Sequence, residues 1–211
     1  MVHDSPSSLL VLHAVRVIGF ADVDAIAART GVGRDDVVKI LSHAEHHGRV
    51  RHDAFAGLEG WSLTEDGRVE NQRMLAHERA DADPDGVIGR VYRDFLPLNA
   101  RLLSACTDWQ LRPSAGDSLA SNDHADLDWD TRVLDELAAL SAALAPLIAR
   151  LAGVLTRFAG YDTRFDTALR RARSCLIEWV DETGVDSCHR VWFQLHEDLV
   201  ATLGVERGTE C

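Results

Sequence analysis

Four small or apolar residues near the N-terminus, Ala27, Gly31, Val37 and Ile40, restrict how residues 20–47 can fold. They follow one another at intervals of four, six and three residues. Small Ala27 allows two helices to approach closely, and Gly31 accepts the positive φ of a tight corner between them. We therefore expect a helix over residues 23–30, a turn at Gly31 and a second helix over residues 34–47, with all four residues buried. This spacing is typical of a helix-turn-helix motif.

The flanking sequence predicts two more helices and a hairpin. Ser7 and Ser8 can cap a helix that runs to about residue 20. Residues 49–52 and 60–63 have strand character and flank an Ala-Phe-Ala-Gly-Leu-Glu segment, which is consistent with a short two-stranded wing. A further helix starts at Thr64 and runs to about residue 80. The predicted order is helix, helix, helix, hairpin, helix.

About the first 75 residues resemble the winged-helix domain of bacterial transcriptional regulators, and they are most similar to the MarR group. Three segments carry the resemblance: Ala27-Ala28-Arg29-Thr30-Gly31-Val32, His47-Gly48-Arg49-Val50 and Trp61-Ser62-Leu63-Thr64-Glu65-Asp66-Gly67-Arg68. The resemblance covers about a third of the chain and implies a DNA-binding domain over residues 1–80. Because winged helices also serve as docking modules, an adaptor or regulatory subunit whose winged helix contacts protein is the alternative.

The helix over residues 34–47 is the candidate reader of the DNA major groove. We expect exposed hydrogen-bond donors in three places to contact DNA: on this helix, beside the wing and at the start of the next helix. They are Arg34, Lys39, Ser42, His43, His46, Arg49, Arg51, His52 and Arg68. Asp35 and Asp36 at the start of the same helix favour its dipole but repel phosphate, so loss of DNA binding stays open as an alternative.

Charge and hydropathy limit the function classes further. The formal net charge is −12, which argues against a protein that coats nucleic acid over its whole surface. Residues 1–80 carry 12 acidic and 9 basic residues, so the acidity belongs mainly to residues 81–211. No stretch approaches the length of a membrane span, and the start has no basic region of a signal peptide. We expect a cytoplasmic protein.

Residues 81–86 have linker composition, and the sequence beyond them predicts an antiparallel helical bundle over residues 81–211. Expected helices include one that Pro146 either ends or kinks, and one over residues 162–180 with Leu176 and Trp179 on its buried side. The bundle would serve dimerisation, the binding of a small-molecule effector, or both. Aromatic and basic residues there could line an effector pocket, and the candidates are Arg93, Arg101, Trp109, Trp129 and Trp192, with Arg132 as a further anchor for an anion.

Two histidine patterns suggest metal or acid–base chemistry, and each has a simpler structural explanation. His43 and His47 have the spacing of metal ligands on a helix, but a solvated face that requires no metal explains them better. His189 and His196 share a helix face, yet only two histidines define it. No nucleophile, phosphate-loop or dinucleotide motif is present, and we therefore expect no catalytic residue, cofactor or metal. The sequence predicts a mainly α protein, a homodimeric DNA-binding transcriptional regulator.

Overall fold

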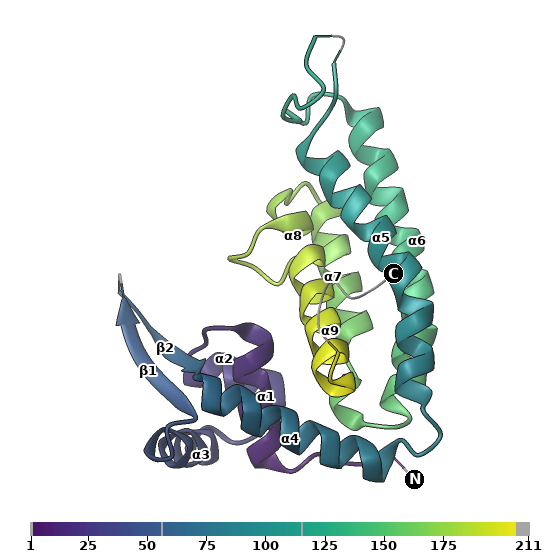
Figure 1. Ribbon diagram of the computed structural model, residues 1–211. Helices are drawn as coiled ribbons and strands as arrows, with labels where there is room; N and C mark the ends of the chain where they lie inside the picture. The colour runs from purple at the N-terminus through teal and green to yellow at the C-terminus, as the bar shows by residue number, and fades with distance from the viewer. Residues whose placement is uncertain (1, 56, 115, 206–211) are drawn as a thin grey trace. The chain divides into compact units, whose positions relative to one another are not determined.

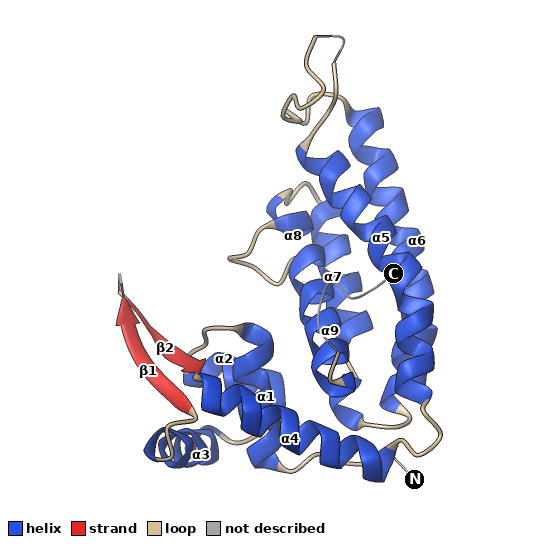
Figure 2. Ribbon diagram, in the orientation of Figure 1, coloured by secondary structure: helices blue, strands red, loops and turns tan. Residues whose placement is uncertain are grey.

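The computed structural model describes residues 2–55, 57–114 and 116–205 (Figure 1). These residues are mainly helical, and their sheet is a single antiparallel pair of strands, which confirms the expected fold class at this level (Figure 2). In chain order the elements are α1 (Ser7–Ile18), α2 (Val23–Thr30), α3 (Arg34–His46), β1 (Val50–Phe55), β2 (Leu58–Leu63), α4 (Glu65–Ala82), α5 (Val87–Gln110), α6 (Leu127–Ala152), the 3-10 helix η1 (Thr156–Phe158), α7 (Tyr161–Arg173), α8 (Glu178–Asp181) and α9 (Cys188–Leu203).

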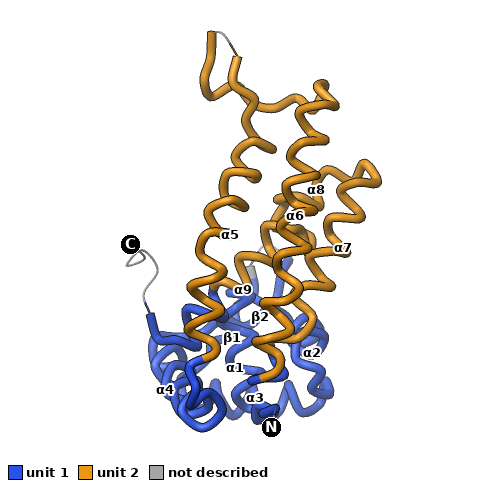
Figure 3. The backbone as a smooth tube through the Cα atoms, turned by 90° about the vertical axis from the view of Figure 1, so that its right-hand side faces the viewer, with its two compact units in different colours: residues 1–86, 154–157, 197–211 blue, residues 87–153, 158–196 orange. Residues whose placement is uncertain are grey.

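Contacts within the chain divide it into two compact units (Figure 3). In the described chain, unit 1 contains residues 2–86, 154–157 and 197–205, and unit 2 contains residues 87–153 and 158–196. The division that we expected between residues 80 and 81 falls inside α4, which ends at Ala82. α9 contributes its first half to unit 2 and its second half to unit 1. Unit 1 is therefore assembled from three separate stretches of sequence.

The core of unit 1 is formed by the apolar sides of α1, α2 and α3. Val11, Val15, Ile26, Val37 and Leu41 are almost completely inaccessible to solvent there. Burying a side chain of this size contributes about 1.5–3 kcal/mol relative to leaving it in water. The spacing of these residues along each helix therefore orients all three helices around one centre.

The corner between α2 and α3 has the expected backbone but not the expected burial. Gly31 ends α2 in the left-handed region, with φ of 71°, and the Asp22 side chain accepts a hydrogen bond from the Ala25 amide at the start of the helix. Val37 is buried, whereas Ala27 and Ile40 are half-buried against the core and Gly31 is exposed. The expectation that all four residues are buried was wrong, because a tight turn must leave the core to reverse the chain.

The hairpin is joined to the α1–α2 connection by backbone hydrogen bonds. β1 and β2 pair in a register that places Val50 opposite Leu63 and Phe55 opposite Leu58. Ala21 and Trp61 exchange two further hydrogen bonds, of 3.1 and 2.8 Å. These bonds tie the base of the hairpin to the helices. Ala56, in the expected turn of the wing, lies outside the described residues.

The regular secondary structure described in unit 2 consists of helices. α5 and α6 run side by side in opposite directions (Figure 1). Its core contains Phe95, Phe165 and Trp192, with Trp192 stacked on Phe95 at 5.0 Å between ring centroids. The indole nitrogen of Trp192 donates to Asn99 at 3.0 Å, so burial leaves this polar group paired.

The structure decides where two helices of unit 2 end. Pro146 lies within α6, and the helix continues to Ala152, so of the two expected alternatives the one in which the helix ends at the proline is excluded. α7 stops at Arg173 rather than near residue 180, and Cys175 has φ of 65°, in the left-handed region that continues no helix. Leu176 is consequently exposed, and Trp179 belongs to the separate helix α8. None of the described helices is long and apolar enough to cross a membrane.

Candidate nucleic-acid interface

The exposed side of α3 carries the polar residues that were expected to face DNA. Val37, Leu41 and Ala44 anchor the opposite side of this helix in the core. The side chains left accessible on it include those of Arg34, Asp35, Asp36, Val38, Lys39, Ser42, His43 and His46. α3 thus presents a helical surface with hydrogen-bond donors and acceptors to solvent.

A tight corner after α3 fixes the positions of the helix, the hairpin and α4. The Thr64 hydroxyl donates to the Gly48 carbonyl at 2.6 Å and accepts from the Gly67 amide at 3.0 Å. A Cβ atom on Gly67 would come within 1.8 Å of the Arg49 carbonyl oxygen. Only glycine therefore fits at position 67, which explains why the segment after β2 contains a threonine and a glycine three residues apart.

The hairpin places Arg51 and His52 on β1, where both side chains are accessible. The Arg51 guanidinium contacts the Asp53 carboxylate at 2.8 Å and donates to the Ser62 hydroxyl at 3.2 Å. The His52 ring lies 4.6 Å from the Trp61 ring, and its Nε2 lies 3.2 Å from Glu59. The polar groups of the wing are thus paired within the hairpin.

Carboxylates also accompany three further basic side chains of this surface, those of Arg34, Lys39 and Arg49. Lys39 Nζ lies 2.9 Å from Asp36, and Arg34 pairs with Asp24. The Arg49 guanidinium lies 3.3 Å from Glu70. Arg68 is exposed at the start of α4. Ion pairs between exposed groups contribute only about 0–1 kcal/mol, so a stronger anionic partner can replace these carboxylates.

The pairing perturbs two ionisable groups of this surface. A hydrogen bond from Lys39 to Asp36, together with the charge of that carboxylate, raises the pKa of Lys39. A hydrogen bond from Arg73, and then the charges of Arg49 and Arg73, lower the pKa of Glu70 against the opposing effect of burial. Lys39 and Glu70 are therefore both charged at neutral pH, and the surface combines positive and negative groups.

The histidines at the end of α3 form a cluster of rings. The His43 and His47 rings are 4.3 Å apart between centroids, and those of His46 and His47 are 5.4 Å apart. His47 Nδ1 lies 2.8 Å from the His43 carbonyl oxygen, so its ring closes the last turn of the helix. Within the described part of the chain, no group of three or more His, Cys, Asp or Glu side chains is arranged to hold a metal ion.

Unit 1 also contains a buried charge cluster that sequence reasoning missed. Arg157 inserts its guanidinium between Glu78, at 3.1 Å, and Asp198, and also donates to Thr202 at 2.7 Å. His13 Nε2 lies 3.0 Å from Asp198. All four ionisable side chains are at most 6% exposed. The cluster joins α1, α4 and α9 to the segment Val154–Arg157.

The electrostatics of the cluster favour a charged Asp198. Burial alone raises the pKa of this carboxyl, but the charges of Arg157 and His13 and the hydrogen bond from His13 outweigh it and bring the pKa well below its usual range. The sequence offered one signal for this site, because His196-Glu197-Asp198 has the residue types of an acid–base group. The structure separates these residues, because His196 lies 5.5 Å from the Phe95 ring and Glu197 binds Arg16 at 3.0 Å.

The effector candidates in unit 2 fall into three environments. A groove of about 460 Å³ between α5 and α6 brings Arg101, Trp129 and Arg132 together. Arg101 binds Glu136 there at 2.7 Å, and Arg132 lies 4.8 Å from the centre of the Trp129 ring. Trp109 and Trp192 are buried and fill the core, and Arg93 is exposed on α5 outside the groove lining.

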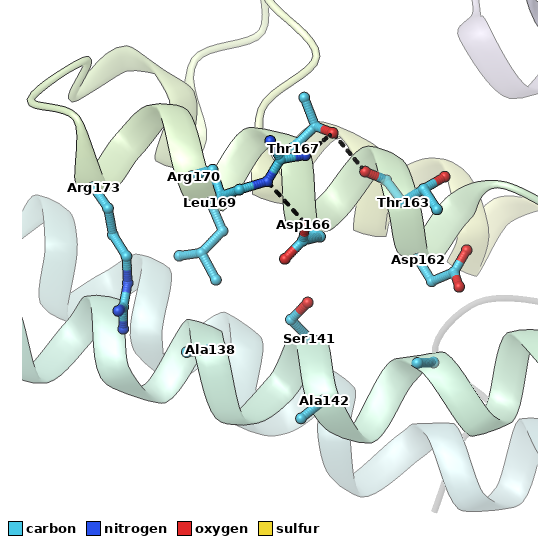
Figure 4. A pocket seen from close by; sticks show the side chains of 11 residues that line it. Ala138, Ser141, Ala142, Asp162, Thr163, Asp166, Thr167, Leu169, Arg170 and Arg173 are labelled. Carbon is cyan, nitrogen blue, oxygen red and sulfur yellow. Dashed lines mark hydrogen bonds and ion pairs between the residues drawn. The ribbon is translucent and has the colours of Figure 1, made fainter.

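A second groove, of about 610 Å³, lies between α6 and α7 (Figure 4). Small side chains of α6, including Ala138, Ser141 and Ala142, form one wall. On the α7 side, Arg170 binds Asp166 at 3.0 Å and donates to Thr167 at 2.9 Å. Three polar side chains of this wall, Asp166, Thr167 and Arg170, therefore bind one another.

Comparisons of the chain with protein-family models, with curated proteins and with solved structures gave no match.

Proposed function

We propose that the protein is a sequence-specific, DNA-binding transcriptional regulator of a bacterium, with a winged helix-turn-helix in unit 1 that reads DNA through α3. The observation that carries this proposal is the surface of α3. The helix is anchored by Val37, Leu41 and Ala44, while Lys39, Ser42, His43 and His46 remain accessible. An anchored helix with exposed donors fits the major groove, which admits one α-helix.

The order of elements supports the proposal. α1, α2 and α3 are followed by the β1–β2 hairpin and α4, in agreement with the order expected for a winged helix. The Ala21–Trp61 bridge and the Thr64–Gly67 corner hold the hairpin beside the helices. Arg51 and His52 on β1 would then contact the phosphate backbone while α3 contacts base edges.

We further propose that the regulator acts as a homodimer. One reading helix contacts few bases, and a two-fold pair of helices binds two half-sites about one helical turn of DNA apart. The helices of unit 2 would provide dimerisation, effector sensing, or both.

The direct test is a titration of the full chain with genomic DNA fragments from the region upstream of its own gene, at several salt concentrations. Specific binding should weaken steeply as salt rises. Lys39→Ala and Arg51→Ala should each lower affinity, and Arg51→Ala, which removes a phosphate contact, should also reduce the slope of log K against log salt by about 0.9. Arg150→Ala, which removes an exposed and paired arginine of unit 2, is the matched control and should leave binding unchanged.

A gain-of-function variant sharpens the test. Asp36→Asn removes the carboxylate that binds Lys39, so it should raise DNA affinity by no more than about fivefold, because exposed ion pairs are weak. Asp81→Asn, which removes an exposed carboxylate of α4 that contacts His77, is the control. The absence of salt-sensitive binding at low ionic strength, with and without a metabolite extract, would contradict the proposal.

A second function is favoured by one specific observation. Val38 is 43% exposed on α3, beside the Lys39–Asp36 pair, and a paired, partly apolar surface suits contact with another protein. Under this function the protein is an adaptor or regulatory subunit. A photoreactive amino acid at position 38 would then crosslink to a protein and not to DNA in cell extract, whereas a regulator would crosslink to DNA.

A further inference from the structure

The last ten residues of α7 are unusually basic for this acidic chain. Residues 164–173 contain four arginines and one aspartate, within a protein of net charge −12. Arg164 and Arg171 of this helix face a groove of about 300 Å³ in unit 2, together with Thr163, Thr167, Trp179 and Asp186. The groove lining carries two guanidinium groups and a single carboxylate, and it is therefore electropositive.

Arg171 is held in position by an aromatic ring. Its guanidinium carbon lies 4.0 Å from the centre of the Trp179 ring, within the range of a cation–π contact. Among the described residues, no carboxylate is paired with Arg171, whereas Arg170 binds Asp166 and Arg173 binds Asp135 at 2.7 Å. Trp179 thus orients the Arg171 guanidinium and leaves its N–H groups available to an anion.

Arg164 supplies a second guanidinium with an unused donor. Its Nε and Nη2 bind the two oxygens of Asp186 at 2.9 and 2.6 Å, and Nη2 also binds Gln194. Nη1 is buried and has no hydrogen-bond partner within the described ranges of the chain. An unpaired buried donor is unfavourable, so an anion in the groove that came within hydrogen-bond distance of Nη1 would be favoured.

We infer that this groove of unit 2 binds a phosphate group, either inorganic phosphate or the phosphate of a small phosphate ester. Arg164 and Arg171 lie seven residues apart on one helix, so an anion that bridges them needs oxygens that point in several directions. Phosphate has this geometry because its oxygens point in tetrahedral directions, whereas a carboxylate offers two oxygens in one plane. The Thr163 and Thr167 hydroxyls donate to backbone carbonyls at the start of α7, which leaves the arginines as the binding groups. The volume suits a small ligand rather than a nucleic acid.

The experiment is a calorimetric titration of the full chain with inorganic phosphate and, separately, with phenyl phosphate, accompanied by tryptophan fluorescence. We expect saturable binding, and Arg171→Gln should weaken it at least about tenfold, because a hydrogen bond to a charged group is worth about 1.5–3 kcal/mol. Arg171→Lys, which keeps the charge but not the planar fork, should weaken it less. Arg170→Gln removes the same charge from the same helix and should leave affinity within about twofold. Trp179→Phe should abolish the fluorescence change.

Each result decides the inference. Tighter binding of phenyl phosphate identifies an ester as the ligand, equal binding identifies the phosphate group alone, and both support the site. A lack of saturable binding, or equal losses in Arg170→Gln and Arg171→Gln, overturns it. Benzoate is the carboxylate control. If benzoate binds as tightly as phosphate, the inference is also overturned. None of these titrations contains DNA, so their outcome is independent of the proposed regulator function.

Discussion

At the scale of single residues, Arg157 has the most consequential environment in unit 1. Its guanidinium is 3% exposed and neutralises two carboxylates, those of Glu78 and Asp198, that are equally buried. A charge taken out of water is tolerated only when partners replace the lost hydration. These three residues, with His13, therefore depend on one another, and removing one leaves an uncompensated charge.

We predict that Asp198→Asn lowers the free energy of unfolding by about 3–5 kcal/mol, because Arg157 and His13 then lose the carboxylate between them. Urea denaturation of the full chain measures this. Asp166→Asn, which removes the carboxylate of the exposed pair with Arg170, is the control and should cost no more than about 1 kcal/mol. Equal losses in the two variants would show that the buried cluster adds nothing beyond a surface pair.

The pKa of Asp198 also predicts a pH dependence. Its folded-state pKa lies below the unfolded value of about 3.9, so the stabilising contribution is complete above about pH 5 and is lost as pH falls through the folded pKa. Urea denaturation of the wild-type chain between pH 7 and pH 3 should show this loss of stability. Asp198→Asn should show a shallower pH dependence over the same range, and an unchanged slope would refute the assignment.

At the scale of elements, the corner between β2 and α4 shows how one glycine fixes a junction. Gly67 lets the first turn of α4 approach the Arg49 carbonyl closely, and Thr64 caps the helix from the same corner. Gly48 and Arg49 belong to this junction and come directly after α3 and its C-cap His47. The junction therefore fixes the position of the C-terminal end of α3.

We predict that Gly67→Ala destabilises the protein by about 1–3 kcal/mol, because the added methyl group must displace backbone rather than a flexible side chain. Gly33→Ala is the matched control: it lies next to α3, has a negative φ, and offers open space within 4 Å of the point that a Cβ atom would occupy. Thermal unfolding of both variants tests this, and a Gly67→Ala midpoint equal to that of Gly33→Ala would contradict it.

Elements with a local signature could be predicted from sequence. α2 has the expected bounds, Gly31 has the expected positive φ, and α3 ends one residue before the expected position. The end of α7 was missed because Ser174 and Cys175 carry no glycine or proline signal, although Cys175 adopts the left-handed conformation. A helix break of this kind is set by tertiary packing, which local periodicity does not encode.

At the scale of the whole molecule, unit 1 is not continuous in sequence. Asp198 contacts His13 across 185 residues, and Arg157 contacts Glu78 across 79. Contacts at such separations leave no local pattern, so the sequence indicated a domain of residues 1–80 and carried no sign of the later segments. The exposed residues of the candidate DNA surface were more predictable, because they lie close together in sequence. The carboxylates that pair with them could not be predicted in the same way.

We predict that a fragment of residues 1–86 does not form a stable domain. It would retain His13 and Glu78 but lack Arg157 and Asp198, and it would expose Leu75, which packs against Ala201 in the full chain. Circular dichroism during urea titration should show no cooperative transition for the fragment, in contrast to the full chain. A sharp transition with a full-length-like midpoint would show that the later segments are dispensable.

The three-part construction of unit 1 imposes an order on its formation during synthesis. Residues 197–205 leave the ribosome 111 residues after Gly86, a delay of roughly 6–22 s at about 5–20 residues per second. During this delay Glu78 and His13 first lack both of their partners. Arg157 is synthesised next, and Asp198 follows 41 residues later. The buried cluster is thus completed last, and α1 and α4 acquire their contacts with Asp198 and Ala201 only when the second half of α9 is available.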